Sequence, residues 1–189
     1  MLLVLGIGLT IGTGQGRPEK VERVSIHTEK GYIVLELYPS RAPKTVANFL
    51  RYVKAGRYTG GFFHRTVTMG NQPDKKIKIE VIQGGPNSSG KDYAPIKLER
   101  TNKTGIKHTD GVISMARDGA DSATSDFFIC IGDQPSLDFG GKRNPDGQGF
   151  AAFGRVVAGM DIVMKIQAAP YKEQTLTPKI RIVEMEVIK

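Results

Sequence analysis

Short segments of alternating apolar and polar residues constrain the fold of this chain more than any other feature. "VSIHT" and "YIVLELY" alternate in this way and are separated by "EKG", which is typical of a β-hairpin. In the second segment Ile33, Leu35 and Leu37 are expected to face a core, and Val34 and Glu36 to face away from it. Further strands are expected in six segments: "FFHRTV", "IKIEVIQGG", "GVISMA", "DFFICI", "FAAFGRVV" and "KIRIVEMEVI". The last of these is expected to pair with the first strands.

The alternation of that last segment, residues 179–188, changes phase near Val183. A single extra residue in one strand shifts the alternation in this way, so the pattern predicts a β-bulge.

Two segments have the helical period instead. In "PSRAPKTVANFLRYVKAG" the apolar face consists of Val46, Phe49, Leu50 and Val53. Pro43 suits the first turn of this helix and Gly56 suits its C-terminal end. The second segment, "GMDIVMKIQ", is expected to place Met160, Val163 and Met164 on one side. Because strands and helices do not alternate as βαβ units, the order favours an antiparallel barrel or sandwich whose ends are closed by helices.

The chain of 189 residues has the length of one domain, and 39% hydrophobic and 24% charged residues are typical of a globular protein. The domain is expected at residues 24–189, preceded by a tail at residues 1–23. Within the tail, Leu2 to Ile11 form an apolar run of signal-peptide length that is too short to span a bilayer. The run predicts export, to the periplasm or beyond, although a lipid-side anchor or an unstructured tail also fits it.

A net charge of +8 permits contacts with anionic partners. The chain has no block of Lys and Arg, however, and Lys75, Lys76 and Lys78 alternate with isoleucines like the solvent-facing side of a strand. Nucleic-acid binding is therefore not expected.

The single cysteine, Cys130, lies in the apolar run "FFICI" and is expected to be a buried hydrophobic residue. The histidines have no ligand spacing, so no metal is expected: they are His27, His64 and His108.

The arginine in "GFFHR" needs an explanation, because a charge within an apolar run requires a partner. Strand alternation predicts that Phe63 and Arg65 share a face, away from Phe62 and His64. The arginine is thus a structural ion pair, a surface residue at a strand end, or a group directed into a site.

By the same rule Val81 and Gln83 share a face, and Asp126 and Phe128 share a face with Cys130. If the three strands are neighbours, an arginine, an amide and an aromatic wall converge. No nucleophile–base pair is expected, because the serines have no evident histidine partner: Ser114, Ser122 and Ser125.

Seven motifs in order resemble the cyclophilin family of peptidyl-prolyl cis-trans isomerases, in a bacterial-like and divergent form. They are "APKTVANFL", "FHR", "VIQGG", "KHTDGVISMAR", "SDFFICI", "LDFGGK" and "FGRVVAGMDIVMKI". The resemblance covers Val24 to Lys189. It implies a mainly β fold, a closed eight-stranded antiparallel barrel capped by two α-helices. It also implies catalysis of X–Pro bond rotation during protein folding, without a cofactor, by a monomer that binds proline-containing peptides or unfolded chains.

The resemblance also assigns site residues. Arg65 is the implied catalytic residue. The implied substrate-binding residues are Val81, Gln83, Ala116, Arg117, Asp126, Phe128, Leu137 and Phe150. Among them Gln83 is expected to contact the substrate carbonyl, Ala116 to lie alongside the peptide backbone, and Phe128, Leu137 and Phe150 to hold the proline ring.

The chain departs from the family pattern at several positions: Glu80, Val81, Arg117, Asp126, Ser136 and Phe150. Residues 66–78 also form an insertion, after which Ile79 is a possible substitute for an aromatic residue that is missing. Ser136 is expected to weaken binding of the family's cyclic-peptide inhibitor. We hypothesise that Asp126 orients Arg65.

Two alternatives to the enzyme stay open. The departures at Glu80 and Asp126 and the insertion favour a catalytically weak module that binds proline-containing segments as a chaperone or adaptor. The positive charge leaves a basic RNA- or surface-binding domain as a further candidate.

Overall fold

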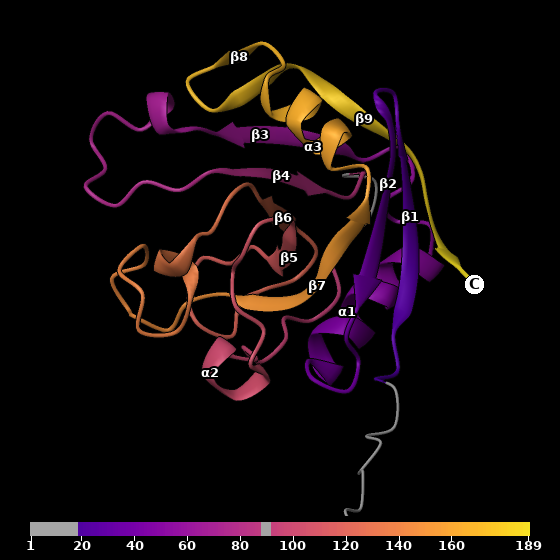
Figure 1. The fold of residues 1–189 in the computed structure, drawn as a ribbon. Helices are drawn as coiled ribbons and strands as arrows, with labels where there is room; N and C mark the ends of the chain where they lie inside the picture. The colour runs from indigo at the N-terminus through magenta and orange to yellow at the C-terminus, as the bar shows by residue number, and fades with distance from the viewer. Residues whose placement is uncertain (1–18, 88–91) are drawn as a thin grey trace, which may run out of the picture.

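The computed structural model describes residues 19–87 and 92–189, so most of the tail predicted at residues 1–23 lies outside the described residues. Eight strands form a closed barrel (Figure 1): β1 (Glu22–Thr28), β2 (Gly31–Leu37), β3 (Phe62–Val67), β4 (Val81–Gly85), β5 (Val112–Met115), β6 (Phe127–Cys130), β7 (Ala151–Ala158) and β9 (Thr175–Ile188). The short strand β8 (Tyr171–Lys172) pairs with β9 outside this ring. The helices are α1 (Pro43–Lys54), α2 (Thr101–Thr104) and α3 (Met160–Gln167), with 3-10 turns at η1 (Met69–Asn71) and η2 (Pro135–Leu137).

The order of strands around the barrel is β1-β2-β7-β5-β6-β4-β3-β9, and pairing of β1 with β9 closes it. Every pairing is antiparallel. The predicted barrel of eight antiparallel strands is therefore confirmed. Its first hairpin is the predicted one, with Thr28 paired to Gly31, and the three residues expected to face the core are fully buried: Ile33, Leu35 and Leu37.

A bulge interrupts β9 at the predicted position. His27 pairs with Glu184 and Thr28 pairs with Ile182, so Val183 is the extra residue. A bulge bends its strand and increases the local twist. Strand β9 pairs with β1 from Ile182 onward and with β3 before that residue, and thus joins the two ends of the sheet.

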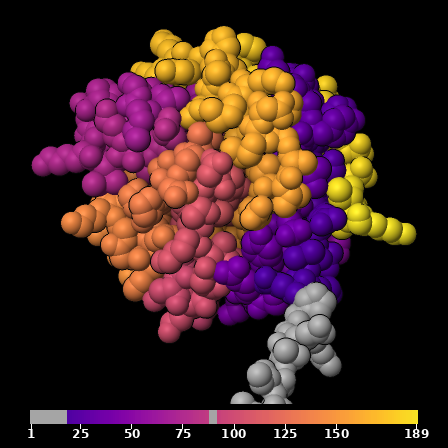
Figure 2. Space-filling view, in the orientation of Figure 1, coloured from indigo at the N-terminus to yellow at the C-terminus, as the bar shows by residue number. Residues whose placement is uncertain are grey.

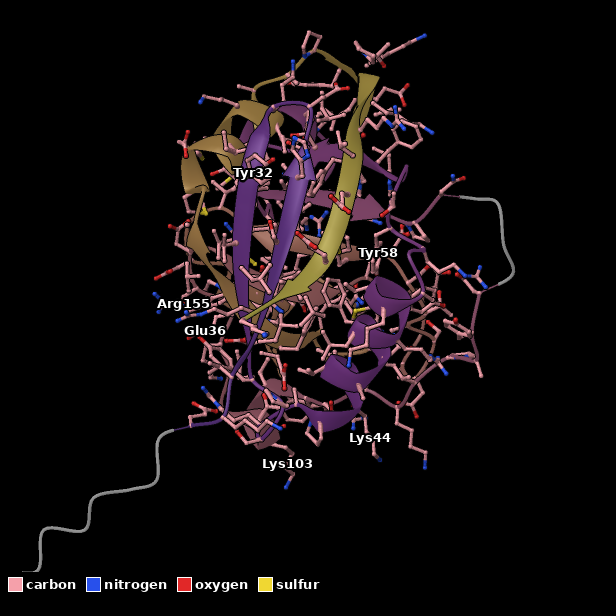
Figure 3. All side chains as sticks on the ribbon, turned by 90° about the vertical axis from the view of Figure 1, so that its right-hand side faces the viewer. Tyr32, Glu36, Lys44, Tyr58, Lys103 and Arg155 are labelled. Carbon is pink, nitrogen blue, oxygen red and sulfur yellow. The ribbon has the colours of Figure 1, made fainter. Side chains whose placement is uncertain are left out.

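Helix α1 matches its prediction. Its four predicted apolar residues are buried, and Gly56 follows the helix with a φ of 65°. In Figure 3, Tyr58 lies beside α1 where the helix packs near β9. Within the barrel Tyr58 and Phe127 contact Phe49 of the helix, with ring centroids 5.2 and 5.7 Å away.

The predicted face of α3 is right for Val163 and for Met160, which packs against the core, but wrong for Met164. Ile162, Val163 and Ile166 are buried, whereas Met164 is 46% exposed. The reason is the contact with β2: a Cβ on Gly31 would lie 2.6 Å from Cδ1 of Ile162, so the bare glycine makes room for that side chain. Helix α2 was not predicted, because a single turn is too short to show a period.

Strand β4 begins at Val81, not at Ile77 as predicted. The backbone of Ile79 instead bonds to the side chain of Gln72, which donates from Nε2 to the carbonyl oxygen at 2.8 Å and accepts the amide at 3.3 Å. These bonds replace those of a strand partner. The lysines predicted to form the solvent face of this strand therefore belong to a loop: Lys75, Lys76 and Lys78.

Two clusters of buried apolar side chains result. One fills the barrel. The other, called here the outer cluster, lies on the outer face of β4 and β6 and consists of Val67, Ile79, Val81, Phe128, Cys130 and Leu137, with Ala116 and Phe150 packed against it. Cys130 is fully buried as predicted, and burial raises the pKa of its thiol well above the usual range. Among residues 19–87 and 92–189, no helix is long and apolar enough to cross a membrane.

Candidate functional site

A pocket of about 440 Å³ opens over the outer cluster. All nine residues that the sequence predicted for the site line it: Arg65, Val81, Gln83, Ala116, Arg117, Asp126, Phe128, Leu137 and Phe150. The neighbouring strands β3, β4 and β6 supply four of them, because Arg65 pairs with Gln83 and Gln83 pairs with Phe128 across the sheet. The predicted convergence of an arginine, an amide and an aromatic wall is confirmed.

The predicted alternation along β3 is wrong, however. Phe63 pairs with Gly84 and Arg65 pairs with Gln83, so His64 is an extra residue in β3. This bulge places Phe63 inside the barrel and Arg65 on the outer face, although two positions separate them. The strand thus contributes Phe63 to the core and Arg65 to the pocket.

Two amides hold the guanidinium of Arg65. Its Nε and Nη2 donate to Oε1 of Gln174 at 3.0 and 2.6 Å, and its Nη1 donates to Oε1 of Gln83 at 3.0 Å. Burial lowers the pKa of Arg65, but a guanidinium remains charged in proteins. The hydrogen bonds formed among the described residues use three of its five N–H groups, which leaves two as donors.

Asp126 fixes the orientation of Gln83. The amide of Gln83 donates from Nε2 to Oδ2 of Asp126 at 3.1 Å, so its Oε1 faces Arg65. His64 Nε2 lies 3.5 Å from the same carboxylate oxygen. Among the described residues no ion pair joins Asp126 to Arg65, so the carboxylate reaches the guanidinium only through Gln83. Gly85 permits this arrangement, because a Cβ there would collide with Oδ1 of Asp126.

The floor and walls of the pocket are apolar. Phe128 and Phe150 meet edge to face, with ring centroids 5.3 Å apart and an interplanar angle of 90°. Ile79 lines the pocket beside them, in agreement with the possibility that it replaces the missing aromatic residue. Glu80 instead accepts a hydrogen bond from Nε2 of Gln167 in α3 at 3.3 Å and does not line the pocket.

Arg117 supports the wall. Its Nη1 and Nη2 donate to the carboxylate of Asp146 at 2.8 and 3.0 Å, and its Nε donates to the carbonyl of Gly149 at 2.8 Å. Hydrogen bonding to Arg117 lowers the pKa of Asp146. The guanidinium lies 5.1 Å from the centroid of Phe150, and the side chain is 1% exposed. It therefore holds the loop before β7 and the Phe150 ring in place.

A buried polar network lies beneath the floor. His108 Nδ1 is 2.9 Å from Oδ1 of Asp138, and its Nε2 is 3.0 Å from Oγ of Ser114. The prediction that Ser114 lacks a histidine partner is therefore wrong, since His108 lies six residues before it, in the loop that precedes β5. Ser114 is fully buried and the His108 ring stacks on Phe128 at 6.0 Å. Because a substrate cannot reach this hydroxyl, the triad-like set supports the floor and is no nucleophile.

Burial lowers the pKa of His108, although hydrogen bonding to Asp138 opposes the shift. The neutral ring donates from Nδ1 to Asp138, since a carboxylate only accepts, and the hydroxyl of Ser114 donates to Nε2.

Sequence reasoning missed two parts of the site. A polar end of the pocket is formed by Asp92, Asp118, Ser122, Thr124 and Ser125, which lie in loops; among them Ser125 alone belongs to a quoted motif, "SDFFICI". Gln174 lies in the turn between β8 and β9, where the local pattern gives no sign that it contacts Arg65.

Figure 2 shows how the chain segments around the site meet: the insertion, in magenta, and the loop before β7, in orange, are adjacent on the left of the molecule. Nη1 of Arg143 in that loop donates to the carbonyl of Ile77 at 2.6 Å. Within the part of the chain that the structure describes, no three His, Cys, Asp or Glu residues are grouped to hold a metal ion. The site thus offers a charged, fixed donor beside an apolar floor.

Comparison with known proteins gives one consistent family. The sequence model described as cyclophilin type peptidyl-prolyl cis-trans isomerase matches residues 23–187. The peptidyl-prolyl cis-trans isomerase cyp18 of Streptomyces antibioticus is 41% identical over 149 residues, which are 76% of this chain and 82% of that protein. Peptidyl-prolyl cis-trans isomerase B of Escherichia coli K12 is 41% identical over 149 residues, 76% of this chain and 83% of that one.

Solved structures agree on the fold. A crystal structure of a cyclophilin type peptidyl-prolyl cis-trans isomerase of Cryptosporidium parvum superposes with a TM-score of 0.73 at 23% identity and covers 90% of this chain and 99% of its own. The same protein in the presence of the dipeptide Ala-Pro superposes with a TM-score of 0.71 at 22% identity, covering 88% and 99% of the two chains.

Proposed function

The chain belongs to the cyclophilin-type peptidyl-prolyl cis-trans isomerase family and is an isomerase of X–Pro bonds, and we propose that Arg65 is the group that catalyses the rotation. The remaining residues of the pocket then bind and orient the peptide around the proline.

The reaction needs a stabilised twisted amide and no bond cleavage. Resonance sets the barrier to rotation at about 20 kcal/mol. When the bond is twisted, the proline nitrogen becomes pyramidal and gains a lone pair that can accept a hydrogen bond. A donor fixed beside that nitrogen stabilises the twisted state more than either planar state, which lowers the barrier.

The geometry around Arg65 is the observation that supports this proposal. Its guanidinium is held by two neutral amides, Gln83 and Gln174, and two N–H groups remain for a substrate. The charge is therefore not neutralised by a contacting carboxylate among the described residues. Partial burial strengthens such a donor, because a lower local dielectric weakens screening.

The apolar part of the pocket fits a proline ring. Phe128 forms its floor, and Val81, Leu137 and Phe150 form its walls. Gln83 donates one amide hydrogen to Asp126 and keeps the second for the carbonyl before the proline. The Cryptosporidium relative was crystallised in the presence of Ala-Pro, which supports a proline-containing segment of a peptide or unfolded protein as the ligand here.

The alternative of a catalytically weak binding module has less support. The features of the sequence that favour it are Glu80, Asp126 and the insertion. Glu80 is directed to α3, Asp126 orients Gln83, and the insertion leaves the pocket lined by the expected residues.

The test is the rate of cis–trans isomerisation of a short Ala-Pro peptide by wild type and by Arg65→Ala. Loss of one preorganised donor is expected to lower kcat/KM by about a hundredfold. The matched control is Arg155→Ala, because Arg155 is exposed on β7, lies beside Glu36 (Figure 3) and does not line the pocket. Arg65→Ala with wild-type activity and an intact fold would refute the role of Arg65.

We also propose that the protein acts outside the cytoplasm and as a monomer. The apolar run at residues 2–11 supports export. Fractionation of cells and N-terminal sequencing of the mature protein test the first point, and light scattering during size-exclusion chromatography tests the second. Full-length protein in the cytoplasmic fraction, or a dimer mass, would contradict them.

A further inference from the structure

We propose that Gln174 is a positioning residue for the isomerase reaction: it fixes the guanidinium of Arg65 in the orientation that catalysis needs. The inference rests on the proposed catalytic role of Arg65. Gln174 lies in the turn between β8 and β9, 109 positions along the chain from the arginine that it contacts.

The contact engages one whole edge of the guanidinium. Oε1 of Gln174 accepts from Nε at 3.0 Å and from Nη2 at 2.6 Å, while Gln83 accepts from Nη1 at 3.0 Å. Three bonds to a planar group fix both its position and its plane. Without Gln174 a single bond to Gln83 remains, and the long side chain of Arg65 regains rotamers that aim its donors elsewhere.

The backbone keeps Gln174 beside the arginine. The amide of Thr66, which follows Arg65, donates to the carbonyl of Gln174 at 2.9 Å, and Thr175 pairs with Arg65 across the sheet. The turn therefore stays in register with the part of β3 that follows the bulge.

The insertion determines which end of the Gln174 amide faces Arg65. Nε2 of Gln174 donates to the carbonyl of Asn71 at 3.1 Å. The side chain of Asn71 is itself held, because it accepts from the amide of Thr68 at 2.8 Å and donates to the carbonyl of Thr66 at 3.1 Å. Since a carbonyl oxygen can only accept, the amide nitrogen of Gln174 points to Asn71 and its oxygen points to the guanidinium.

A neutral anchor suits the proposed mechanism. A carboxylate at this place would form a bidentate ion pair with the guanidinium and offset the charge that acts on the proline nitrogen. It would also lie against the carbonyl of Asn71 with no hydrogen to donate. An amide supplies the same acceptor without either effect.

The experiment compares Gln174→Ala, Arg65→Ala and the double variant in isomerisation of an Ala-Pro peptide, with kcat and peptide Kd measured separately. Gln174→Ala is expected to lower kcat about tenfold, the size of one hydrogen bond to a charged group, and to leave Kd unchanged. In the Arg65→Ala background the same change is expected to have no further effect, because a residue that acts through Arg65 has nothing left to position. Lys172→Ala, an exposed residue of the same hairpin, is the control for disturbance of the turn.

Gln174→Glu is the second variant. It keeps the acceptor but introduces the charge, and we expect kcat below that of wild type with the peptide Kd again unchanged. Wild-type kcat in this variant would overturn the argument for a neutral anchor.

The outcomes separate the two proposals. If Arg65→Ala is slow but Gln174→Ala is as fast as wild type, the inference about Gln174 is overturned and the proposed function stands. An additional tenfold loss in the double variant would also overturn it, because Gln174 would then act independently of the arginine. If Arg65→Ala is fully active, both proposals fail.

Discussion

At the scale of single residues, the site depends on amides that accept hydrogen bonds from a cation. Gln83 and Gln174 orient Arg65, and Asp126 contributes by orienting Gln83. The carboxylate of Asp126 is thus separated from the guanidinium by the Gln83 amide and its two hydrogen bonds. What matters at position 126 is an oxygen that accepts from Nε2 of Gln83.

Asp126→Asn is therefore expected to retain activity or raise it, because an asparagine oxygen can still accept that hydrogen bond. Asp126→Ala should lower kcat/KM by about tenfold, since Gln83 is then free to rotate. Both are measured with the peptide assay after circular dichroism has verified the fold. A large loss of activity in folded Asp126→Asn would mean that the carboxylate charge itself is needed.

His108 makes the stability of the protein depend on pH. Burial holds its pKa in the folded state below the usual value, so the unfolded chain binds the proton more readily. The contribution of His108 to the free energy of unfolding is fully present above about pH 6.5, the ordinary pKa of histidine. It decreases as the pH falls from there toward the lower pKa of the folded state. His108→Gln should show a smaller decrease between pH 7 and pH 5 in denaturant titrations. Equal decreases in both proteins would show that His108 is not responsible.

The site residues show how far the sequence alone could predict the site. The faces of Val81, Gln83 and Phe128 could be predicted because regular strands alternate strictly. The opposite faces of Phe63 and Arg65 could not, because the bulge at His64 depends on the pairing partner and leaves no local pattern. The role of Gln174 could not be predicted for a similar reason, since its contact with Arg65 of β3 exists only in the folded chain.

At the scale of elements, the insertion is a structured part of the site. Gln72 is 1% exposed and bonds to the carbonyls of Thr68 and Ile79 and to the amide of Ile79. These bonds close the loop and place Ile79 in the pocket wall. The predicted continuation of β4 through this segment failed because a side chain replaced the strand partner.

Gln72→Ala is expected to lower the free energy of unfolding by about 1–3 kcal/mol, because buried backbone groups of the loop lose their partners. The peptide Kd should rise several-fold as Ile79 loses its fixed position. Lys75→Ala, an exposed residue of the same loop, is the matched control for both denaturation and binding. Unchanged peptide binding in a destabilised Gln72→Ala would separate the loop from the pocket.

At the scale of the whole molecule, the two faces of the barrel sheet have different roles. The inner face packs the barrel core, and the outer face of β4 and β6 carries the apolar floor of the pocket. The number of strands and the closure of β9 onto β1 were predictable, because alternation and turn residues occur all along the chain. The loops that complete the pocket were not, since their positions follow from tertiary contacts such as that of Arg143 with Ile77.

This division predicts different effects for two matched truncations. Ile26→Ala removes a fully buried side chain from the barrel core and should lower the free energy of unfolding by about 2–5 kcal/mol, with kcat/KM unchanged below the melting transition. Leu137→Ala in the outer cluster should weaken peptide binding. Denaturation and isomerisation measured on both variants check the claim, and a loss of activity in folded Ile26→Ala would contradict it.

The central claim is that a fixed guanidinium, and not merely a positive charge, catalyses the rotation. The direct test is the isomerisation rate of an Ala-Pro peptide with Arg65→Lys, which keeps the charge but lacks the planar fork that Gln83 and Gln174 hold. The account predicts a kcat/KM within a few-fold of that of Arg65→Ala. A lysine variant as fast as wild type would contradict it, because a point charge near the pocket would then be enough.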